Sequence, residues 1–316
     1  MQSAIMLGLF SSAAAPTIPI HGVGGATLSM PLVGLGTWRM GNVTAATVTA
    51  ALNTGYRHLD CALGYENQLG VGKGIAASGM GRESFWVTSK VPGGLNATAM
   101  EAALELSVAQ LGLPYVDLML VHYPASWSKI GGPALRKEGW LAMEAWAKRT
   151  GKAKALGVSH YCKRHLDDVL SVATEPVALN QVQYHVGMGP DSGVNASLRH
   201  DPAYMKSKGV VYAAYSSLCG PCPSPDNMEL ITGELVSKIG SAHGKTGAQV
   251  ALRWAVQRGI PVIPKSTNPL HLKQNLDLFD WSLSDEEMGE LDEARSPVET
   301  GTPPQKPDDA QDCLVP

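Results

Sequence analysis

Eight short apolar runs alternate with longer helical patterns along almost the whole of this 316-residue chain. Most of the runs are apolar at consecutive positions, which is typical of strands that are covered on both faces. They are LVGLGT (32–37), YRHLD (56–60), FWVTSK (85–90), VDLMLVH (116–122), KALGVS (154–159), ALNQVQY (178–184), VVYAAYS (210–216) and PVIPKS (261–266). Because each run leads into a helix pattern or a long loop, the sequence predicts an α/β fold of the (β/α)8 TIM-barrel type.

The segments between the runs carry the start and stop signals of helices. The clearest helix begins after Asn96, a favourable N-cap, and ends at Gly112, with apolar residues at helical spacing between them. A second is expected between Thr246 and Gly259. Ahead of the first run, residues 17–31 hold two short strand-like pieces around the glycine-rich HGVGG, which predicts an N-terminal β-hairpin.

The order of these elements predicts one domain over residues 17–296, because a barrel of this kind takes roughly 250 residues. Residues 1–16 are expected to be an N-terminal extension. They end in small residues as a signal peptide does, but they lack a basic start, so secretion or organelle targeting stays open as an alternative. Residues 297–316 are rich in proline and have no periodicity, so we expect a C-terminal tail over the barrel mouth.

Composition excludes several classes of protein. The chain is 44% hydrophobic and 17% charged, as soluble globular proteins are. Its net charge of −3, without a cluster of Lys and Arg, argues against a nucleic-acid surface, and no apolar run is long enough to span a membrane. The five cysteines, an odd number, do not predict a disulfide framework, so a reducing, cytoplasmic setting is expected. A barrel closes its own sheet, so a monomer is expected as well.

Four reactive side chains lie at or just after the ends of consecutive runs. Asp60 closes the second run and is followed by Tyr65, Lys90 closes the third and His122 the fourth. The carboxyl ends of parallel strands meet at one barrel mouth, so these groups are expected to converge. A lysine cation beside a tyrosine is expected to lower the phenol pKa from its usual value near ~10 and to fit it for proton transfer to a carbonyl oxygen. Taken alone, each of these residues is also compatible with a purely structural role in place of a catalytic one, as a turn cap, a surface charge or a core side chain.

In these residues the chain resembles the aldo-keto reductase family, over about residues 17–296. The matching stretches are MPLVGLGTW, YRHLDCALGYEN, LGLPYVDLMLVHYP, LGVSHY, LNQVQYH, AYSSL and IPKSTNPLHLKQN. The resemblance implies that Asp60, Tyr65, Lys90 and His122 form a catalytic tetrad in which Tyr65 is the general acid. It also implies an NADP-dependent oxidoreductase that reduces aldehydes or ketones to alcohols by hydride transfer. The segment between Tyr65 and Lys90 is slightly shorter than the family pattern.

The sequence contains no nucleotide-binding motif with the usual spacing. The glycine-rich stretches GVGKG (70–74) and GSAHGKT (240–246) both lack the spacing that such motifs need. The resemblance nevertheless implies that NADPH or NADP+ is held on the barrel loops. The implied cofactor residues are Thr37 and Trp38 on the first loop, Ser159, His160 and Gln181 at the carboxamide, Tyr215 under the nicotinamide ring, Ser216, Ser217 and Leu218 at the pyrophosphate, Lys265, Ser266, Thr267 and His271 at the 2′-phosphate, and Gln274 and Asn275 at the adenine.

Two of these residues depart from the family pattern. His160 replaces a usual asparagine, and His271 replaces a usual arginine. A neutral histidine is a weaker anion partner than arginine, so NADH is expected to compete better than usual.

A small carbonyl substrate is expected between three aromatic side chains, Trp38, Tyr123 and Trp127. No metal site is expected.

Two other functions stay open at this point. One is a non-catalytic or regulatory NADP-binding barrel. The other, less expected, is a thiol–disulfide oxidoreductase that works through the Cys-Gly-Pro-Cys motif of Cys219 and Cys222. Such a centre needs its first cysteine at the start of a helix, whereas three prolines follow Cys219 within six residues.

Overall fold

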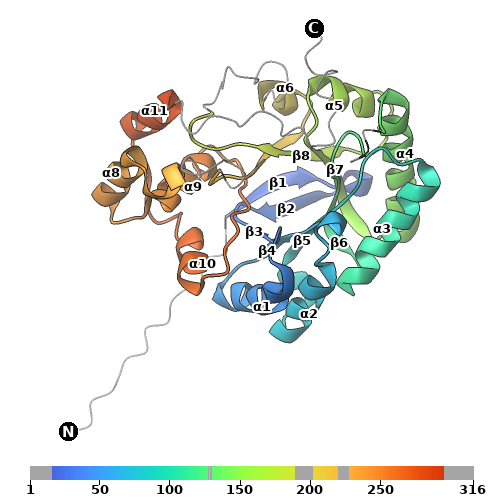
Figure 1. Ribbon diagram of the computed structural model, residues 1–316. Coiled ribbons are helices and arrows are strands. Elements are labelled where there is room, and N and C mark those ends of the chain that lie inside the picture. Colours follow the sequence, from blue (N-terminus) through green and yellow to red (C-terminus); the bar gives the residue numbers. More distant parts are fainter. Residues whose placement is uncertain (1–15, 127, 129, 189–201, 220–227, 295–316) are drawn as a thin grey trace.

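The computed structural model describes residues 16–126, 128, 130–188, 202–219 and 228–294, and it is a barrel of parallel strands with helices around it (Figure 1). Seven strands pair in sequence order, all parallel. They are β3 (Leu35–Gly36), β4 (His58–Asp60), β5 (Trp86–Val91), β6 (Val116–Val121), β7 (Ala153–Ser159), β8 (Val177–Gln183) and β9 (Val211–Tyr215).

The eighth strand is reduced to a single bridging residue. Val262 pairs with Val33 on one side and with Ala214 on the other, so the sheet closes on itself. The amide of Gly34 donates to the Val262 carbonyl at 2.9 Å, and that of Ala214 donates to the Pro261 carbonyl at 2.8 Å. The strand predicted over 261–266 is this short because Pro261 and Pro264 have no N–H to donate. The predicted barrel is confirmed.

Helices and short 3-10 turns join the strands. The α-helices are α1 (Thr44–Thr54), α2 (Gln68–Ser78), α3 (Ala97–Leu111), α4 (Pro133–Thr150), α5 (Lys163–Leu170), α6 (Pro202–Ser207), α7 (Glu229–Thr232), α8 (Glu234–His243), α9 (Gly247–Val256), α10 (Pro269–Leu276) and α11 (Asp285–Glu293). The 3-10 turns are η1 (Val23–Gly25), η2 (Gly41–Val43), η3 (Leu63–Tyr65) and η4 (Arg82–Ser84). None of the helices in these described parts is long and apolar enough to cross a bilayer.

The predicted helix ends are largely confirmed. Asn96 caps α3 by accepting a hydrogen bond from the Ala99 amide at 3.0 Å, and Gly112 ends the helix in the left-handed conformation. Thr246 caps α9 through a capping box with Gln249. The second helix ends at Val256, two residues before the end that a closing Gly259 predicted.

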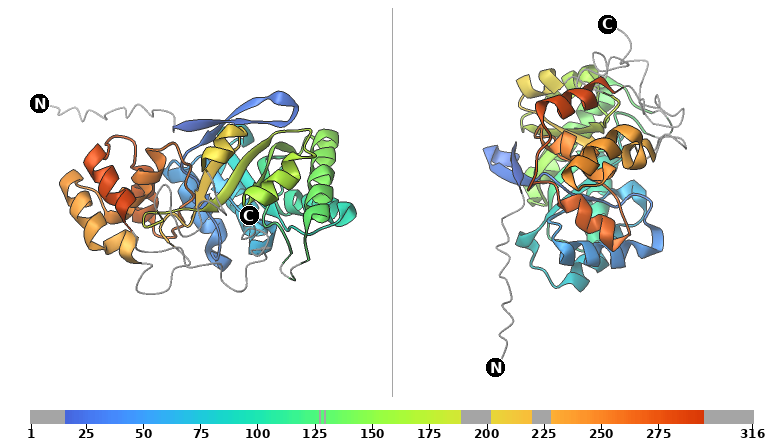
Figure 2. Two further views of the ribbon diagram at one scale, coloured as in Figure 1. Left: turned by 90° about the horizontal axis from the view of Figure 1, so that it is seen from above. Right: turned by 90° about the vertical axis from the view of Figure 1, so that its left-hand side faces the viewer.

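The hairpin predicted at the N-terminus is confirmed and lies across one end of the barrel (Figure 2). Its strands are β1 (Thr17–His21) and β2 (Thr27–Pro31). Ile20 and Met30 on the hairpin pack with Trp86, Leu118 and other apolar residues near the starts of the barrel strands. The hairpin therefore seals the amino-terminal end of the barrel and leaves the chemistry to the opposite end.

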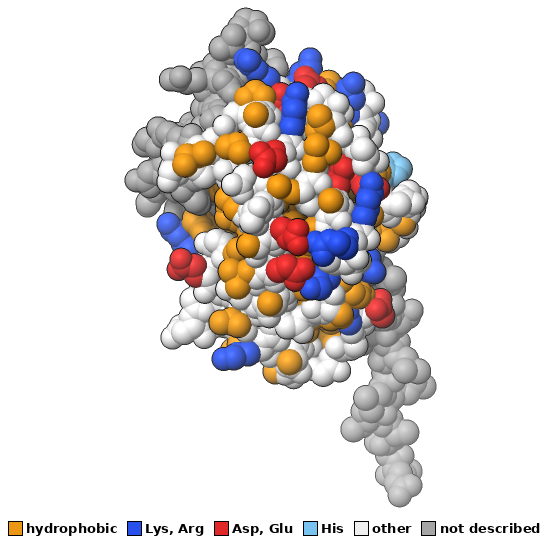
Figure 3. All heavy atoms as spheres, turned by 90° about the vertical axis from the view of Figure 1, so that its right-hand side faces the viewer, with side chains coloured by type: hydrophobic (Ala, Val, Ile, Leu, Met, Phe, Trp, Pro, Cys, Tyr) orange, Lys and Arg blue, Asp and Glu red, His pale blue; other side chains and the backbone are white. Residues whose placement is uncertain are grey.

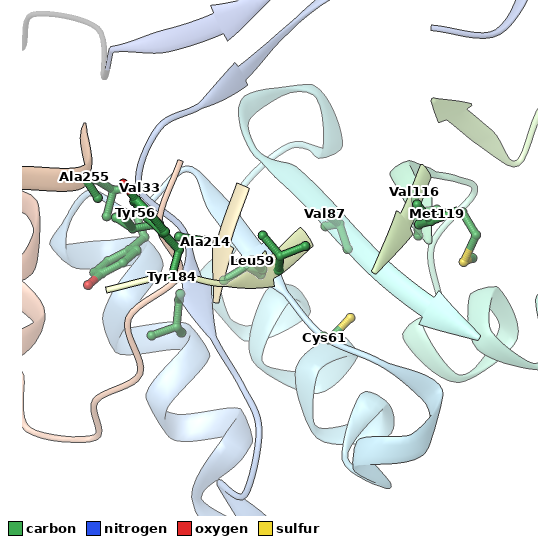
Figure 4. Close-up of a cluster of buried hydrophobic side chains, with 14 of the residues drawn as sticks. Val33, Tyr56, Leu59, Cys61, Val87, Val116, Met119, Tyr184, Ala214 and Ala255 are labelled. Carbon is green, nitrogen blue, oxygen red and sulfur yellow. The ribbon is translucent and has the colours of Figure 1, made fainter. Parts of the chain in front are cut away.

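A large hydrophobic core fills the space between the strands and the helices. Trp140, Trp146 and Trp254 are fully buried in it, as expected of packing residues. Figure 4 shows part of this core, with Leu59 of β4 and Val87 of the neighbouring strand β5 among the labelled side chains. On the face shown in Figure 3, acidic and basic side chains alternate, so the described residues there form no patch of one sign.

Candidate active site

The carboxyl ends of β4, β5 and β6 bring the four predicted tetrad residues together. Asp60 is the last residue of β4, Lys90 lies one residue before the end of β5, and His122 directly follows β6. Tyr65 ends the turn η3, five residues after Asp60. The turn is short enough to fold back over the barrel, which places the phenol beside Lys90.

Asp60 and Lys90 form a fully buried ion pair. The Lys90 ammonium donates to Asp60 Oδ1, and the two side chains are 1% and 0% exposed. Lys90 Nζ also donates to the Cys61 carbonyl at 3.3 Å, while Asp60 Oδ2 accepts a hydrogen bond from the Gln181 amide at 2.9 Å. Every charge in this pair is therefore met by a partner, which a buried ion pair requires.

Tyr65 and His122 are half-buried and form the outer half of the site. The Tyr65 hydroxyl lies 3.3 Å from Lys90 Nζ. The rings of Tyr65 and His122 meet edge to face, with centroids 5.5 Å apart. The site thus has two layers, a buried charged pair and, above it, a phenol and an imidazole that a small molecule can reach.

The pKa of Tyr65 is raised well above its ordinary value. Burial is the main cause, and the negative charges of Asp60 and of an ionised Cys61 add to it. This direction is opposite to the expectation that Lys90 and Asp60 would lower the pKa, because burial raises it and Asp60 adds to the rise. The phenol therefore holds its proton at neutral pH, the state that a general acid needs.

The pKa of His122 is held well below its ordinary value. The surrounding protein desolvates the ring, and the Lys90 charge acts in the same direction. At neutral pH the imidazole is therefore uncharged, with one nitrogen that donates and one that accepts.

A row of stacked aromatic rings leads away from the tetrad. Tyr123 stacks on His122 with centroids 4.5 Å apart and on His160 with centroids 4.1 Å apart. His160 in turn lies 4.6 Å from the ring of Tyr215. The row connects the loops after β6 and β7 with the last residue of β9, so these predicted residues share one mouth. Trp127 of the same loop as Tyr123 lies outside the described residues.

His160 is held in a constrained conformation. Its φ is 64°, in the left-handed region. Its Nδ1 lies 2.9 Å from Ser159 Oγ and 3.0 Å from the His122 carbonyl, which can only accept. The Nδ1 therefore carries the proton in the neutral ring. Ser159 Oγ donates to the Gln181 carbonyl at 2.8 Å.

The first loop supplies two of the predicted cofactor residues. Thr37 is buried, and its hydroxyl donates to the Asp60 carbonyl at 2.9 Å, so it also supports the tetrad. Trp38 is 42% exposed, and the guanidinium of Arg39 lies 4.2 Å from its ring centroid. Trp38 is thus exposed enough to contact a bound molecule, whereas Thr37 is a buried residue that supports Asp60.

The loop after β9 offers an orphaned polar atom. Ser217 is 2% exposed, and its hydroxyl is buried without a hydrogen-bond partner. Its neighbour Ser216 has a φ of 54°, and Leu218 packs against the core. A buried hydroxyl is costly when unpaired, so the site fits a bound group that would accept its proton, such as a phosphate.

The residues predicted at the adenosine end divide into two sets. Lys265, Thr267 and His271 are exposed near the start of α10 and fit an anion. The Ser266 hydroxyl accepts from the Asn268 amide at 3.1 Å, and Gln274 is half-buried. Asn275 is 4% exposed and approaches the Tyr56 hydroxyl in the core, which sets it apart from the exposed residues.

The sequence analysis missed a polar network behind the tetrad. The side-chain amide of Gln68 donates to Ser89 Oγ at 2.7 Å and to Ser107 Oγ at 3.1 Å. Ser89 precedes Lys90 on β5, so the network ties α2 and α3 to the strand that carries the lysine. The sequence signal that could have predicted this network was the presence of these polar residues inside helix and strand patterns that are otherwise apolar.

The described cysteines occur in two states. Cys61 is a free, buried thiol, and burial raises its pKa to about 11. Cys162 and Cys219, in contrast, are both disulfide-bonded. Cys219 is fully buried, and Cys222 lies outside the described residues. Among the described residues no group of His, Cys, Asp or Glu could hold a metal ion.

Comparison with known proteins agrees with this geometry. The model of the Aldo/keto reductase family matches residues 32–296. The chain is 36% identical to aldo-keto reductase family 1 member A1 of Cricetulus griseus, over 83% of this chain and 86% of that protein. It is also 36% identical to the glyoxal reductase of Bacillus subtilis (strain 168), over 88% of this chain and 93% of that protein.

A solved structure shows the same fold. MGS-M4, an aldo-keto reductase enzyme from a Medee basin deep-sea metagenome library, superimposes with a TM-score of 0.74 at 33% identity, covering 87% of this chain and 94% of that one. The chain belongs to the aldo-keto reductase family.

Proposed function

We propose that this protein reduces small aldehydes or ketones to alcohols with NADPH, and that Tyr65 is the general acid. The observation that carries the proposal is the position of Lys90, whose ammonium is bound to Asp60 and lies 3.3 Å from the Tyr65 hydroxyl. When bound, the nicotinamide cofactor supplies a hydride to the carbonyl carbon.

The residues of the chain account for the proton in this reaction. As the carbonyl carbon accepts the hydride, its oxygen becomes an alkoxide and takes the proton of the Tyr65 hydroxyl. The raised pKa keeps that proton in place at neutral pH. The phenolate that remains faces the Lys90 cation, which stabilises it, and a proton from solvent restores the phenol.

His122 orients the carbonyl in this proposal. Its ring meets that of Tyr65, and its pKa is low enough to keep it neutral. A neutral imidazole can hydrogen-bond to the substrate oxygen without adding a charge that would compete with Tyr65. In this proposal the aromatic side chains Trp38 and Tyr123 line the substrate pocket, which would suit a small carbonyl compound.

NADPH fits the remaining residues. Ser217 presents its unpaired hydroxyl to a phosphate, and Lys265 and Thr267 would hold the 2′-phosphate, with weaker help from His271. Dissociation constants for NADPH and NADH, measured by fluorescence, test this assignment. Lys265→Met is expected to weaken NADPH binding at least tenfold and to leave NADH binding unchanged.

The experiment that tests the reductase is a substrate panel with a tyrosine variant. Glyoxal belongs in the panel because a relative is named for it. Loss of NADPH is expected with the wild type and not with Tyr65→Phe. A protein that binds NADPH but oxidises it with no carbonyl would support a regulatory barrel instead. We further propose a monomer, since the closed barrel offers no free sheet edge, and sizing chromatography tests this.

A further inference from the structure

Two glycines after β5 lie against the backbone of the loop that carries Tyr123. A Cβ at Gly93 would lie 1.8 Å from the Tyr123 carbonyl oxygen and 3.3 Å from the Ala125 amide. A Cβ at Gly94 would lie 2.0 Å from the Ile130 carbonyl oxygen, and its φ of +68° already favours glycine. Both contacts are with backbone, which cannot swing aside as a side chain can.

The loop that rests on these glycines is closed on itself. The Ser126 amide donates to the Ile130 carbonyl at 2.8 Å, and the Ile130 amide donates to Ser126 Oγ at 3.1 Å. Tyr123 precedes this hydrogen-bonded pair on the same loop, and its own backbone carbonyl is the atom nearest to a Cβ at Gly93.

Tyr123 transmits its position to the tetrad. Its ring stacks on both His122 and His160, with centroids 4.5 Å and 4.1 Å apart, and His122 meets the ring of Tyr65. Because real Cβ atoms essentially never approach within 3.0 Å, a side chain at Gly93 would push the Tyr123 backbone more than 1 Å away. Misplacements of that size near a reacting centre can cost about 100-fold in rate.

From these contacts we infer that Gly93 is a positioning residue that sets the place of Tyr123, and through it the selectivity of the site for the size of the carbonyl substrate. The inference rests on the proposed reductase activity. Gly93 acts through the backbone of Tyr123 and touches no reacting atom itself.

A comparison of two aldehydes tests the selectivity. With Gly93→Ala, kcat/KM for benzaldehyde is expected to fall at least tenfold more than kcat/KM for acetaldehyde, because the larger aldehyde has more surface to meet a displaced Tyr123 ring. Gly81→Ala is the matched control, because a Cβ there meets nothing within 4 Å and its φ is −64°.

A double mutant separates positioning from a general loss of structure. In a Tyr123→Ala background, Gly93→Ala should no longer change the ratio of the two kcat/KM values, because the ring that it displaces is absent. Equal losses for both aldehydes, or the same ratio change with and without the Tyr123 ring, would overturn the inference.

A second readout does not depend on turnover. The Tyr123 ring stacks on His122 and His160, so their ring proton resonances should shift in Gly93→Ala while those of exposed His271 stay in place. Unchanged resonances of His122 and His160 would overturn the positioning role. If the wild type reduces no carbonyl, the proposed function fails, and this spectrum still decides the role of Gly93.

Discussion

Replacing one partner of the Asp60–Lys90 pair should destabilise the protein far more than replacing both. Lys90→Met leaves the Asp60 carboxylate in the barrel with the Gln181 amide and without its counter-ion. Asp60→Asn leaves a buried ammonium that still contacts the Cys61 carbonyl and the Tyr65 hydroxyl. With side chains only 0% and 1% exposed, solvent cannot replace the lost partner, and each single change should cost about 3–5 kcal/mol of unfolding free energy.

The double variant Asp60→Asn, Lys90→Met removes both charges together. It leaves no uncompensated buried charge, so it should be more stable than the sum of the single changes by about 2 kcal/mol or more. The assay is equilibrium unfolding in guanidinium chloride at pH 7, with turnover recorded for each variant. All three are expected to be inactive, because each lacks the charge arrangement beside Tyr65.

Two results would refute this reasoning. Single variants that lose less than about 1 kcal/mol would mean that the pair is not buried as described. A double variant whose loss equals the sum of the two single losses would mean that the two charges do not stabilise each other.

The remaining predictions concern stability and reactivity. Burial lowers the pKa of both His58 and His185 to about 4, whereas the pKa of an unfolded histidine is about 6.5. Between pH 4 and pH 6.5 the unfolded chain therefore binds more protons than the folded protein. The free energy of unfolding should therefore keep its whole value above pH 6.5 and fall by up to about 3 kcal/mol for each histidine as the pH drops through 4. A free energy of unfolding that does not change with pH would contradict this. Cys61, with a pKa of about 11, should resist iodoacetamide at pH 8 in the native protein and react after unfolding, as mass spectrometry would show; rapid native labelling at Cys61 would contradict its burial. Thr246→Ala should cost about 1 kcal/mol through the lost cap of α9, and an unchanged denaturation midpoint would argue against the capping box.

The sequence predicted the barrel and the convergence of the tetrad because both follow from local patterns. Consecutive apolar residues mark strands that are covered on both faces, and parallel strands necessarily end at one mouth. Asp60, Lys90 and His122 could therefore be placed together without any long-range information. The eighth strand was predicted too long, since Pro261 and Pro264 interrupt its hydrogen bonding.

Properties that depend on burial were beyond the sequence. The direction of the Tyr65 pKa shift follows from how much water the surrounding residues exclude, and that follows only from the packed site. The resemblance implied Asn275 as an adenine contact, whereas its burial, at 4% exposed on α10, follows only from the packed structure. The contact between Gly93 and Tyr123 joins two loops that no periodicity relates.

The central claim is that Tyr65 protonates a carbonyl compound as NADPH is oxidised. The most direct measurement is the loss of NADPH absorbance with a panel of small aldehydes and ketones, with wild type and Tyr65→Phe side by side and NADPH binding confirmed for both. The account predicts turnover by the wild type and at least a 100-fold loss in the variant, with cofactor binding retained. Equal turnover by both proteins, or none by either, would contradict it.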